Sequence, residues 1–272
     1  MADGYAGRHN SAVRTARLLQ QKKHRLERRC FLIEGPLLLQ AALESGASIE
    51  HIFVAGDEPL EGFKDLPPVI RVDQRTLDSL SQAKTPQGIV AVAKFIDLDP
   101  SELERLLPKN GPAVVLVLPS LSDPGNAGTL IRSAEAFGAS AVCFGPDAVE
   151  PYNDKVVRAS MGSLFRVPIV RYEEWPDFVA AARAAKLQIV AAEAGGTDVR
   201  DVTLPQRACL VIGQERHGHA GLPREDVDTA VSLPQRAGVD SLNAAVAGSL
   251  LLYEFERAHA SKSSTRSGTS RA

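Results

Sequence analysis

Polar residues suited to binding or activating a substrate stand beside short apolar runs in the second half of the chain. The run 209–212 ends at Gly213, which is typical of a buried strand leading into a turn. A second run, 230–233, ends at Pro234 and is followed by Ser241, a good helix N-cap with small residues after it. Glycine turns and a polar helix start, all at strand ends, predict a ligand crevice. Ordinary turns and a capped helix are the alternative interpretation.

An amide and a guanidinium lie earlier, in the segment 126–137, which is expected to form one helix. Asn126 and Arg132 are six residues apart, so they do not share one tight helix face. Asn126 stands near the helix start, where a simple capping role is the alternative. Arg132 is a charged residue in an otherwise mostly apolar stretch.

Three segments in order carry a family resemblance: DPGNAGTLIRSAEAFG at 123–138, IGQERHG at 212–218 and LPQRAGVDSLNAAVA at 233–247. Together they resemble the motifs of the SpoU (TrmH-type) RNA ribose 2′-O-methyltransferases, over about residues 114–257. The resemblance implies an α/β fold with a knotted (trefoil) parallel-sheet SPOUT methyltransferase domain, a homodimer, and S-adenosylmethionine as methyl donor. Periodicity shows neither knot nor dimer, and general topology rules disfavour knots.

The resemblance also implies site residues. Those expected to hold S-adenosylmethionine are Ile212, Gly213, Leu233, Leu242, Glu193 and Gly218. Those expected to serve catalysis are Asn126, Arg132, Glu215, Ser241 and Asn243. Apolar strand ends suit an adenine ring, while turn amides and carbonyls suit its polar edges. Methyl transfer further requires an aligned acceptor oxygen and either removal of its proton or stabilisation of its developing charge.

Arg132 is the residue whose loss is expected to matter most. The matching arginine is the family's leading candidate for activating the ribose hydroxyl, across a dimer interface. A guanidinium has a pKa above ~12 and rarely gives up its proton. A cation that binds phosphate and stabilises the alkoxide is therefore at least as reasonable. His217 and His219 are less usual for the family, and their spacing gives no evidence of a metal site, so none is expected.

Composition describes an ordinary globular protein of 272 residues, with 24% charged residues and a formal net charge of −2. Its three cysteines are far apart and lack metal-ligand spacing, which favours a reducing compartment. No signal peptide or membrane span is visible, so a cytoplasmic location is expected.

Basic residues cluster near the start of the chain. Before Phe31 there are eight of them against two acidic residues, a local excess that suggests phosphate contacts, although charge runs are usually solvated faces. The segment NDKVVRASMGSLFRVP also resembles the family. The residues expected to contact RNA are Arg25, Arg28, Arg29, Lys155 and Arg158.

Four regions are expected: an RNA substrate-binding domain at 1–96, a linker at 97–112, the methyltransferase domain at 113–258 and a disordered tail at 259–272. The start of the chain and TPQGIVAVA resemble the L30e-like α/β domain that precedes many SpoU catalytic domains. A helix from 10 or 11 to 29 should open this domain. After residue 113, strands alternate with helices, which predicts a parallel sheet covered on both faces.

The predicted function is 2′-O-methylation of structured RNA, above all 23S-type ribosomal RNA. The same chemistry on tRNA is one alternative, and a non-catalytic RNA-binding protein that keeps the fold is another. A nicotinamide dinucleotide enzyme is disfavoured because no G-x-G-x-x-G follows the first strand of the large domain.

Overall fold

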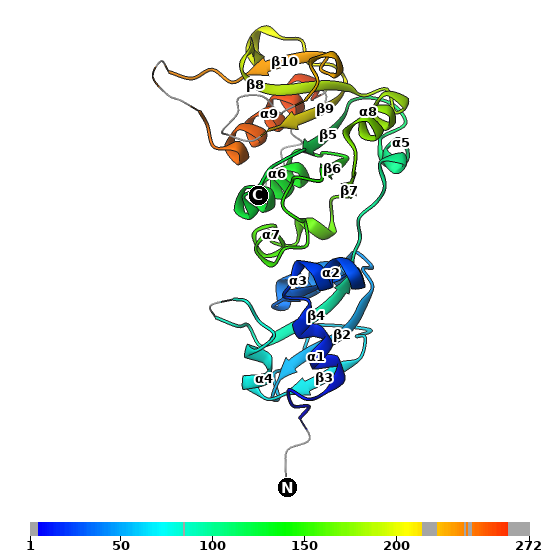
Figure 1. Ribbon diagram of the computed structural model, residues 1–272, viewed down its shortest axis with the longest axis vertical. Coiled ribbons are helices and arrows are strands. Elements are labelled where there is room, and N and C mark those ends of the chain that lie inside the picture. Colours follow the sequence, from blue (N-terminus) through cyan, green and yellow to red (C-terminus); the bar gives the residue numbers. More distant parts are fainter. Residues whose placement is uncertain (1–4, 84, 214–221, 237, 239–240, 261–272) are drawn as a thin grey trace, which may run out of the picture.

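The computed structural model describes residues 5–83, 85–213, 222–236, 238 and 241–260. They form two domains stacked along the long axis of the molecule (Figure 1). The N-terminal domain contains a four-stranded sheet of order β1-β4-β2-β3. The C-terminal domain contains a six-stranded sheet of order β10-β8-β9-β5-β6-β7.

The N-terminal sheet is mixed, because β4 pairs antiparallel with β1 and β2 while β2 and β3 are parallel. The elements of this domain are α1 (Ser11–Leu18), α2 (Lys22–Arg28), β1 (Cys30–Glu34), α3 (Pro36–Glu44), β2 (Ile49–Ala55), β3 (Val69–Val72), α4 (Gln74–Asp78) and β4 (Ile89–Lys94).

The prediction of one continuous helix up to residue 29 is wrong, because the structure has two helices, one ending at Leu18 and the next beginning at Lys22. Asn10 caps α1 as expected, its side chain accepting from the amides of Ala12 and Val13. The helix stops at Leu18, and Gln20 donates from its side chain to the carbonyls of Ser79 and Leu80 at the end of α4. This tertiary contact holds the chain in a turn, which local propensity does not predict.

The C-terminal sheet is parallel throughout, as the alternation predicts. The elements of this part are η1 (Pro100–Glu102), α5 (Leu103–Leu106), β5 (Ala113–Leu118), α6 (Pro124–Ala136), β6 (Ala141–Phe144), α7 (Asp154–Ala159), η2 (Ser163–Phe165), β7 (Ile169–Arg171), α8 (Trp175–Ala184), β8 (Gln188–Asp198), η3 (Val199–Asp201), β9 (Arg207–Ile212), η4 (Arg224–Asp226), β10 (Thr229–Ser232) and α9 (Ala244–His259).

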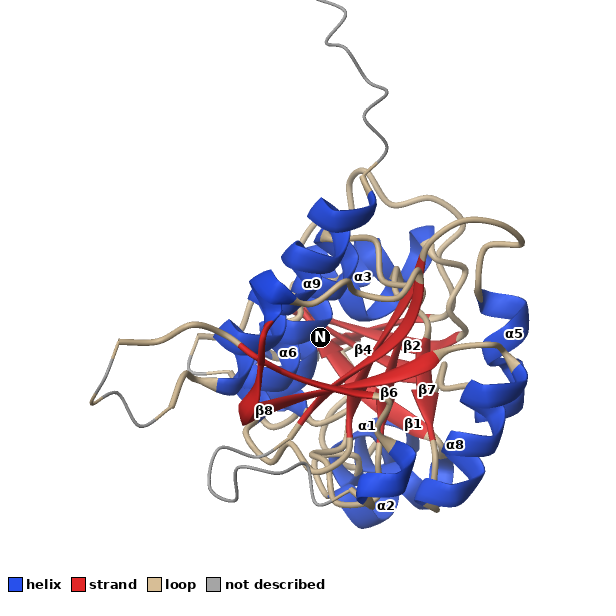
Figure 2. Ribbon diagram, turned by 90° about the horizontal axis from the view of Figure 1, so that it is seen from above, coloured by secondary structure: helices blue, strands red, loops and turns tan. Residues whose placement is uncertain are grey.

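Both faces of this sheet are covered by helices (Figure 2). Every residue of β5 is buried, and its side chains alternate between two apolar clusters. Val114, Leu116 and Leu118 face the cluster that includes α6 and α9, while Val115 and Val117 face the cluster that includes α5 and α8. Because successive side chains of a strand point to opposite faces, a strand covered on both sides is apolar throughout.

The predicted linker 97–112 packs against the C-terminal domain. Leu98 forms a bridge with Val170, and Leu103 and Leu107 are buried in the cluster with α8. No helix within the described ranges is both long and apolar enough to cross a membrane.

Candidate active site

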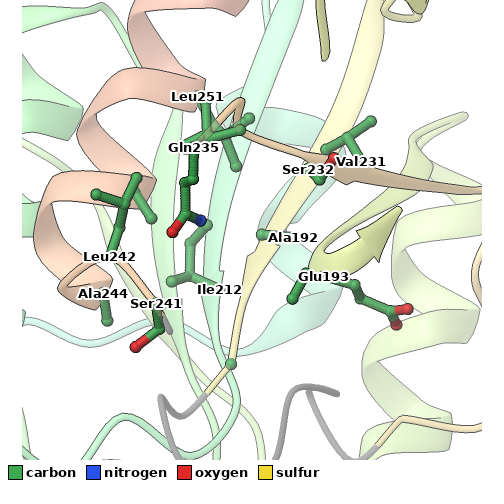
Figure 3. A pocket seen from close by; sticks show the side chains of 14 residues that line it. Ala192, Glu193, Ile212, Val231, Ser232, Gln235, Ser241, Leu242, Ala244 and Leu251 are labelled. Atoms are coloured by element: carbon green, nitrogen blue, oxygen red, sulfur yellow. The ribbon is translucent and has the colours of Figure 1, made fainter. Parts of the chain in front are cut away.

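A pocket opens at the carboxyl ends of β9 and β10 and beside the start of α9 (Figure 3). It is open to solvent, and about 710 Å³ of non-atom space, part of it open solvent, lies within its bounds. Its walls are mainly apolar, and its polar side chains are few. The residues that line it are Ala192, Glu193, Ala194, Ile212, Gly213, Val231, Ser232, Leu233, Gln235, Ser241, Leu242, Ala244, Ala247 and Leu251.

One wall of the pocket comes from a break in the pairing of β8 with β10. Ala191 pairs with Ala230, but the next residue of β10, Val231, pairs with Thr197. Residues 192–196 of β8 therefore have no register partner on β10 and bulge from the ladder. Gly196 permits this path, since a Cβ there would lie 2.6 Å from the backbone of Val231.

The opposite wall comes from α9, whose small residues bring it close to the sheet. Gly248 packs where a Cβ would meet Leu130 of α6 at 2.5 Å and Ile212 of β9 at 3.2 Å. Ala244, Ala247 and Leu251 recur at helical spacing and all line the pocket. The small-residue stretch noted in the sequence thus lets the helix contact α6 and the end of β9.

The start of α9 differs from the prediction, because its N-cap is Asn243 and not Ser241. The Asn243 side-chain oxygen accepts from the amides of Ala245 and Val246, at 2.9 and 3.2 Å. Ser241 is thereby left in the loop that lines the pocket. Similarly, the N-cap of α6 is Asp123, whose carboxylate accepts from the amide of Asn126, so the Asn126 side chain does not cap the helix.

The side chains of Asn126 and Asn243 meet, 117 residues apart in sequence. Asn243 donates from Nδ2 to Oδ1 of Asn126 at 3.0 Å. Backbone amides can only donate, so capping fixes the oxygen of Asn243 towards α9 and its NH2 group towards Asn126. Asn126 must then accept with its oxygen, and its own NH2 group has no acceptor among the described residues. Asn126 therefore offers hydrogen-bond donors beside the pocket.

Arg132 lies on the exposed side of α6. Within the described ranges its guanidinium has no hydrogen bond or ion pair. The helices α6 and α9 lie side by side and parallel, joined by the Asn126–Asn243 bond, a hydroxyl pair between Ser133 and Ser249, and an edge contact between Phe137 and Tyr253. The outer side of α9 carries an exposed apolar stripe, which consists of Val246, Leu250 and Tyr253.

Five of the residues expected at the donor site line the pocket: Glu193, Ile212, Gly213, Leu233 and Leu242. Figure 3 shows the Gln235 amide pointing into the space between Leu242 and Ala192, whereas the Glu193 carboxylate points away from it. Gln235 was missed, although it lies within the third motif segment. Ala244, Ala247 and Leu251 of α9 were not predicted either, although their recurrence at helical spacing could have identified them. Glu215, His217, Gly218 and His219 lie outside the described residues.

The structure corrects the expectation that Arg25 contacts RNA. Its side chain is 5% exposed and forms a two-pronged ion pair with Glu150 of the C-terminal domain, at 2.6 to 3.1 Å. The same guanidinium donates to the carbonyls of Leu19 and Gln20. With its donors engaged and its charge buried, Arg25 cannot reach a phosphate.

The other predicted RNA contacts remain at the surface to different degrees. Arg28 and Lys155 are exposed. Arg29 is exposed but pairs with Asp97 at 3.1 Å and lies over the ring of Phe95. Arg158 is about one-third exposed and already pairs with Asp154 at 2.6 Å and Glu34 at 3.5 Å. Two carboxylates thus neutralise Arg158, which leaves Arg28 and Lys155 as the more available cations.

Among the described residues, no group of three histidine, cysteine or acidic side chains is arranged to hold a metal ion. Cys30, Cys143 and Cys209 are buried free thiols. Burial raises the pKa of each of these thiols.

Comparison with known proteins adds independent findings. The SpoU rRNA Methylase family model matches residues 113–253, and the MRM3-like substrate binding domain model matches residues 10–91. The chain is 30% identical over 250 residues to the 23S rRNA (guanosine(2553)-2′-O)-methyltransferase RlmP of Bacillus subtilis, covering 90% of this chain and 96% of RlmP. It is 32% identical over 253 residues to the 23S rRNA (uridine(2479)-2′-O)-methyltransferase of Streptomyces viridochromogenes, covering 88% of this chain and 87% of that protein.

Among solved structures, the AdoMet-bound rRNA methyltransferase from Sinorhizobium meliloti has a TM-score of 0.79 and 31% identity. The alignment covers 91% of this chain and 95% of that chain. The resemblance of the three motifs is therefore confirmed by a family match to half of the chain and by relatives aligned along most of it. The chain belongs to the SpoU rRNA methylase family.

Proposed function

We propose that this chain transfers a methyl group from S-adenosylmethionine to a ribose 2′-hydroxyl of 23S-type ribosomal RNA. The observation that carries the proposal is the Asn126–Asn243 hydrogen bond, which joins the loop at the edge of the pocket to the first turn of α6. The named relatives from Bacillus subtilis and Streptomyces viridochromogenes act on a guanosine and a uridine, respectively. The chemistry proposed here concerns the ribose and is common to both bases.

The pocket fits S-adenosylmethionine. Ile212, Leu242 and Leu251 provide apolar walls for an adenine ring, and Gln235 and Ser241 provide polar groups. The bound donor supplies a methyl group on a positively charged sulfur, and the ribose oxygen attacks the carbon of that methyl group. What the chain must provide is a fixed donor position and the space through which the oxygen approaches. The bulge at residues 192–196 and the start of α9 define that space.

Asn126 and Arg132 act on the acceptor. The Asn126 NH2 group is held outward and donates to a phosphate or ribose oxygen. Because a guanidinium rarely gives up its proton, Arg132 acts as a cation that stabilises the negative charge developing on the 2′-oxygen as the proton leaves to water. Glu215, Ser241 and Asn243 complete the proposed catalytic set, with Asn243 acting through Asn126.

The working unit is a homodimer formed through the outer faces of α6 and α9. Val246, Leu250 and Tyr253 form a stripe at spacings of four and three, and each is more than two-fifths exposed. Contiguous exposed apolar surface is a mark of a protein interface. Arg132 is exposed on α6, the helix that packs along α9, and in the proposed dimer it serves the partner's pocket. The trefoil knot that the family resemblance implies for the methyltransferase domain is also part of this proposal.

RNA is recognised by the L30e-like N-terminal domain. Four cations on α1 and α2 are exposed and have no acidic partner within the described ranges: Arg14, Arg17, Lys22 and Arg28. Phosphate contacts from such cations give affinity that falls with salt. Lys155 on α7 extends the basic surface onto the C-terminal domain. A ribosomal RNA substrate also agrees with the expected cytoplasmic location.

The test is methyl transfer by the purified chain, with labelled S-adenosylmethionine and separate 23S rRNA, 16S rRNA and tRNA transcripts, followed by mapping of 2′-O-methyl groups. We expect one or a few ribose positions in 23S rRNA to be modified. Modification confined to tRNA would show that the substrate is tRNA and not 23S rRNA. Donor binding without transfer to any RNA would indicate a non-catalytic binder. Loss of one 2′-O-methyl group from the rRNA of a deletion strain would identify the target.

A further inference from the structure

The two domains are joined by a buried ion pair rather than by a linker alone. Arg25 of α2 and Glu150 of the C-terminal domain have side chains 5% and 3% exposed. The guanidinium binds both carboxylate oxygens, through Nε and Nη2. Its remaining nitrogen donates to the carbonyls of Leu19 and Gln20. A paired guanidinium and carboxylate fix angle as well as distance, because both groups are planar.

A second fixed point lies at Tyr152, which is also buried. Its ring stacks on Phe95 at 3.9 Å between centroids and contacts Phe31 at 4.7 Å, both from the N-terminal domain. Its hydroxyl donates to the Asp97 carboxylate at 3.0 Å and accepts from the Ile96 amide at 2.9 Å. Burial, with Asp97 nearby, raises the pKa of Tyr152, so the hydroxyl keeps the proton that it donates.

The contact surface continues on the side of α3 and α7. Arg158 of α7 lies 3.5 Å from Glu34 at the end of β1. Gly162 packs so closely on α3 that a Cβ there would lie 2.9 Å from that of Ala41. One apolar cluster includes residues of both domains, such as Leu39 and Val157. Domains joined by an extensive apolar contact do not move freely relative to each other.

We infer that Arg25 and Glu150 are positioning residues, which set the angle of the RNA-binding domain against the methyl-transfer site. This inference rests on the proposed function. The apolar contact holds the domains together, and the directional ion pair selects one orientation. RNA bound to α1 and α2 then presents its target ribose at a fixed place relative to Asn126. A small error in that place costs much rate, because transfer requires the acceptor oxygen to be aligned with the donor methyl.

The variant Arg25→Met/Glu150→Leu removes both charges and leaves none unpaired, which keeps the fold testable. Arg105→Met/Glu102→Leu, which removes an exposed ion pair between Arg105 of α5 and Glu102 of η1, is the matched control. Orientation is measured by the distance distribution between spin labels at Gln40→Cys in α3 and Ala180→Cys in α8. Both positions are exposed, and the three native cysteines are buried, which favours labelling at the introduced sites.

For the double variant we expect a broader distance distribution, donor affinity within about twofold, and kcat for 23S rRNA lower by about tenfold or more with little change in KM. The control should keep the narrow distribution and the wild-type kcat. A double variant with the wild-type distribution, or with kcat within about twofold of wild type, overturns the inference. Wild-type protein without transfer activity would instead refute the proposed function, and the distances would still test the fixed orientation.

Discussion

At the scale of single residues, Asn243 links three parts of the site. It caps α9, follows the loop that carries Ser241, and fixes the amide of Asn126. Its oxygen caps α9 and its NH2 group binds Asn126, so one substitution can affect the cap and the Asn126 contact differently. Capping needs only an acceptor, whereas orienting Asn126 needs a donor.

Asn243→Asp separates these two roles. An aspartate still caps α9, and its negative charge suits a helix N-terminus, so the thermal midpoint should stay near that of wild type. Its carboxylate cannot donate, so Asn126 must turn its NH2 group inward and lose its outward donors. We expect kcat to fall by at least about tenfold, as for loss of a positioned donor. Asn243→Ala should lose both activity and ~1 kcal/mol of stability. Equal activity of Asn243→Asp and wild type would remove the orienting role.

Arg132→Ala should abolish methyl transfer while donor affinity, measured by calorimetry, stays within a few-fold. The reason is that Arg132 lies outside the pocket lining, on the exposed side of α6. Arg105→Ala provides the control, since Arg105 is exposed on α5 and, within the part of the chain that the structure describes, pairs only with Glu102. Arg132→Lys keeps the charge but not the planar fork, so its activity should lie between that of Arg132→Ala and that of wild type. Full activity of Arg132→Ala would exclude this residue from the mechanism.

At the scale of elements, α9 has two sides with different tasks. Ala244, Ala247 and Leu251 face the pocket, while Val246, Leu250 and Tyr253 face outward. If the outer side is the dimer interface, Leu250→Glu should give monomers in analytical ultracentrifugation and greatly reduce transfer. Leu37→Glu, at a leucine on α3 that is at least as exposed as Leu250, should leave the mass unchanged. A monomeric wild-type chain with full activity would contradict the dimer and the trans role of Arg132 together.

The sequence predicted these elements well wherever burial alone decides them. The run 113–118 is apolar throughout because both faces of β5 are covered. It did not predict the break after Leu18, which depends on Gln20 contacting residues sixty positions away, nor the bulge at residues 192–196, which depends on how β10 pairs. At the site, the motifs identified Ile212 and Leu242 but assigned the helix cap to Ser241, because both Ser241 and Asn243 are good caps.

At the scale of the whole molecule, charge near the start of the chain divides into a surface part and a buried part. Replacing Arg14, Arg17 and Arg28 with alanine should flatten the salt dependence of RNA binding, each lost phosphate contact changing the logarithmic slope by about 0.7–0.9. Filter binding at several salt concentrations measures this slope. Because Arg25 makes no phosphate contact, the variant Arg25→Met/Glu150→Leu should have the same slope as wild type. A slope that falls in this variant but not in the triple one would reverse the assignment.

The same division predicts different effects on folding. Arg25→Ala leaves the Glu150 carboxylate buried without its partner, and breaking such a pair costs about 3–5 kcal/mol. Removing both charges, as in Arg25→Met/Glu150→Leu, should cost far less or stabilise the protein. Urea unfolding of the two variants beside wild type measures the difference. Similar free energies of unfolding for both would mean that water or another group satisfies Glu150 once Arg25 is gone.

The buried contact between the domains also limits how this protein can be recombined with its relatives. An RNA-binding domain exchanged at residue 96 would separate Arg25 from Glu150 and Phe31 from Tyr152, even though the polypeptide cut lies at the predicted domain boundary. A functional chimera must carry α2, β1 and the residues around Glu150 as one inherited unit. Target specificity in this architecture is therefore expected to change by substitutions on the outer surfaces of α1 and α2 rather than by exchange of whole domains. A library of chimeras with and without the matched Glu150 region would show which route retains methyl transfer.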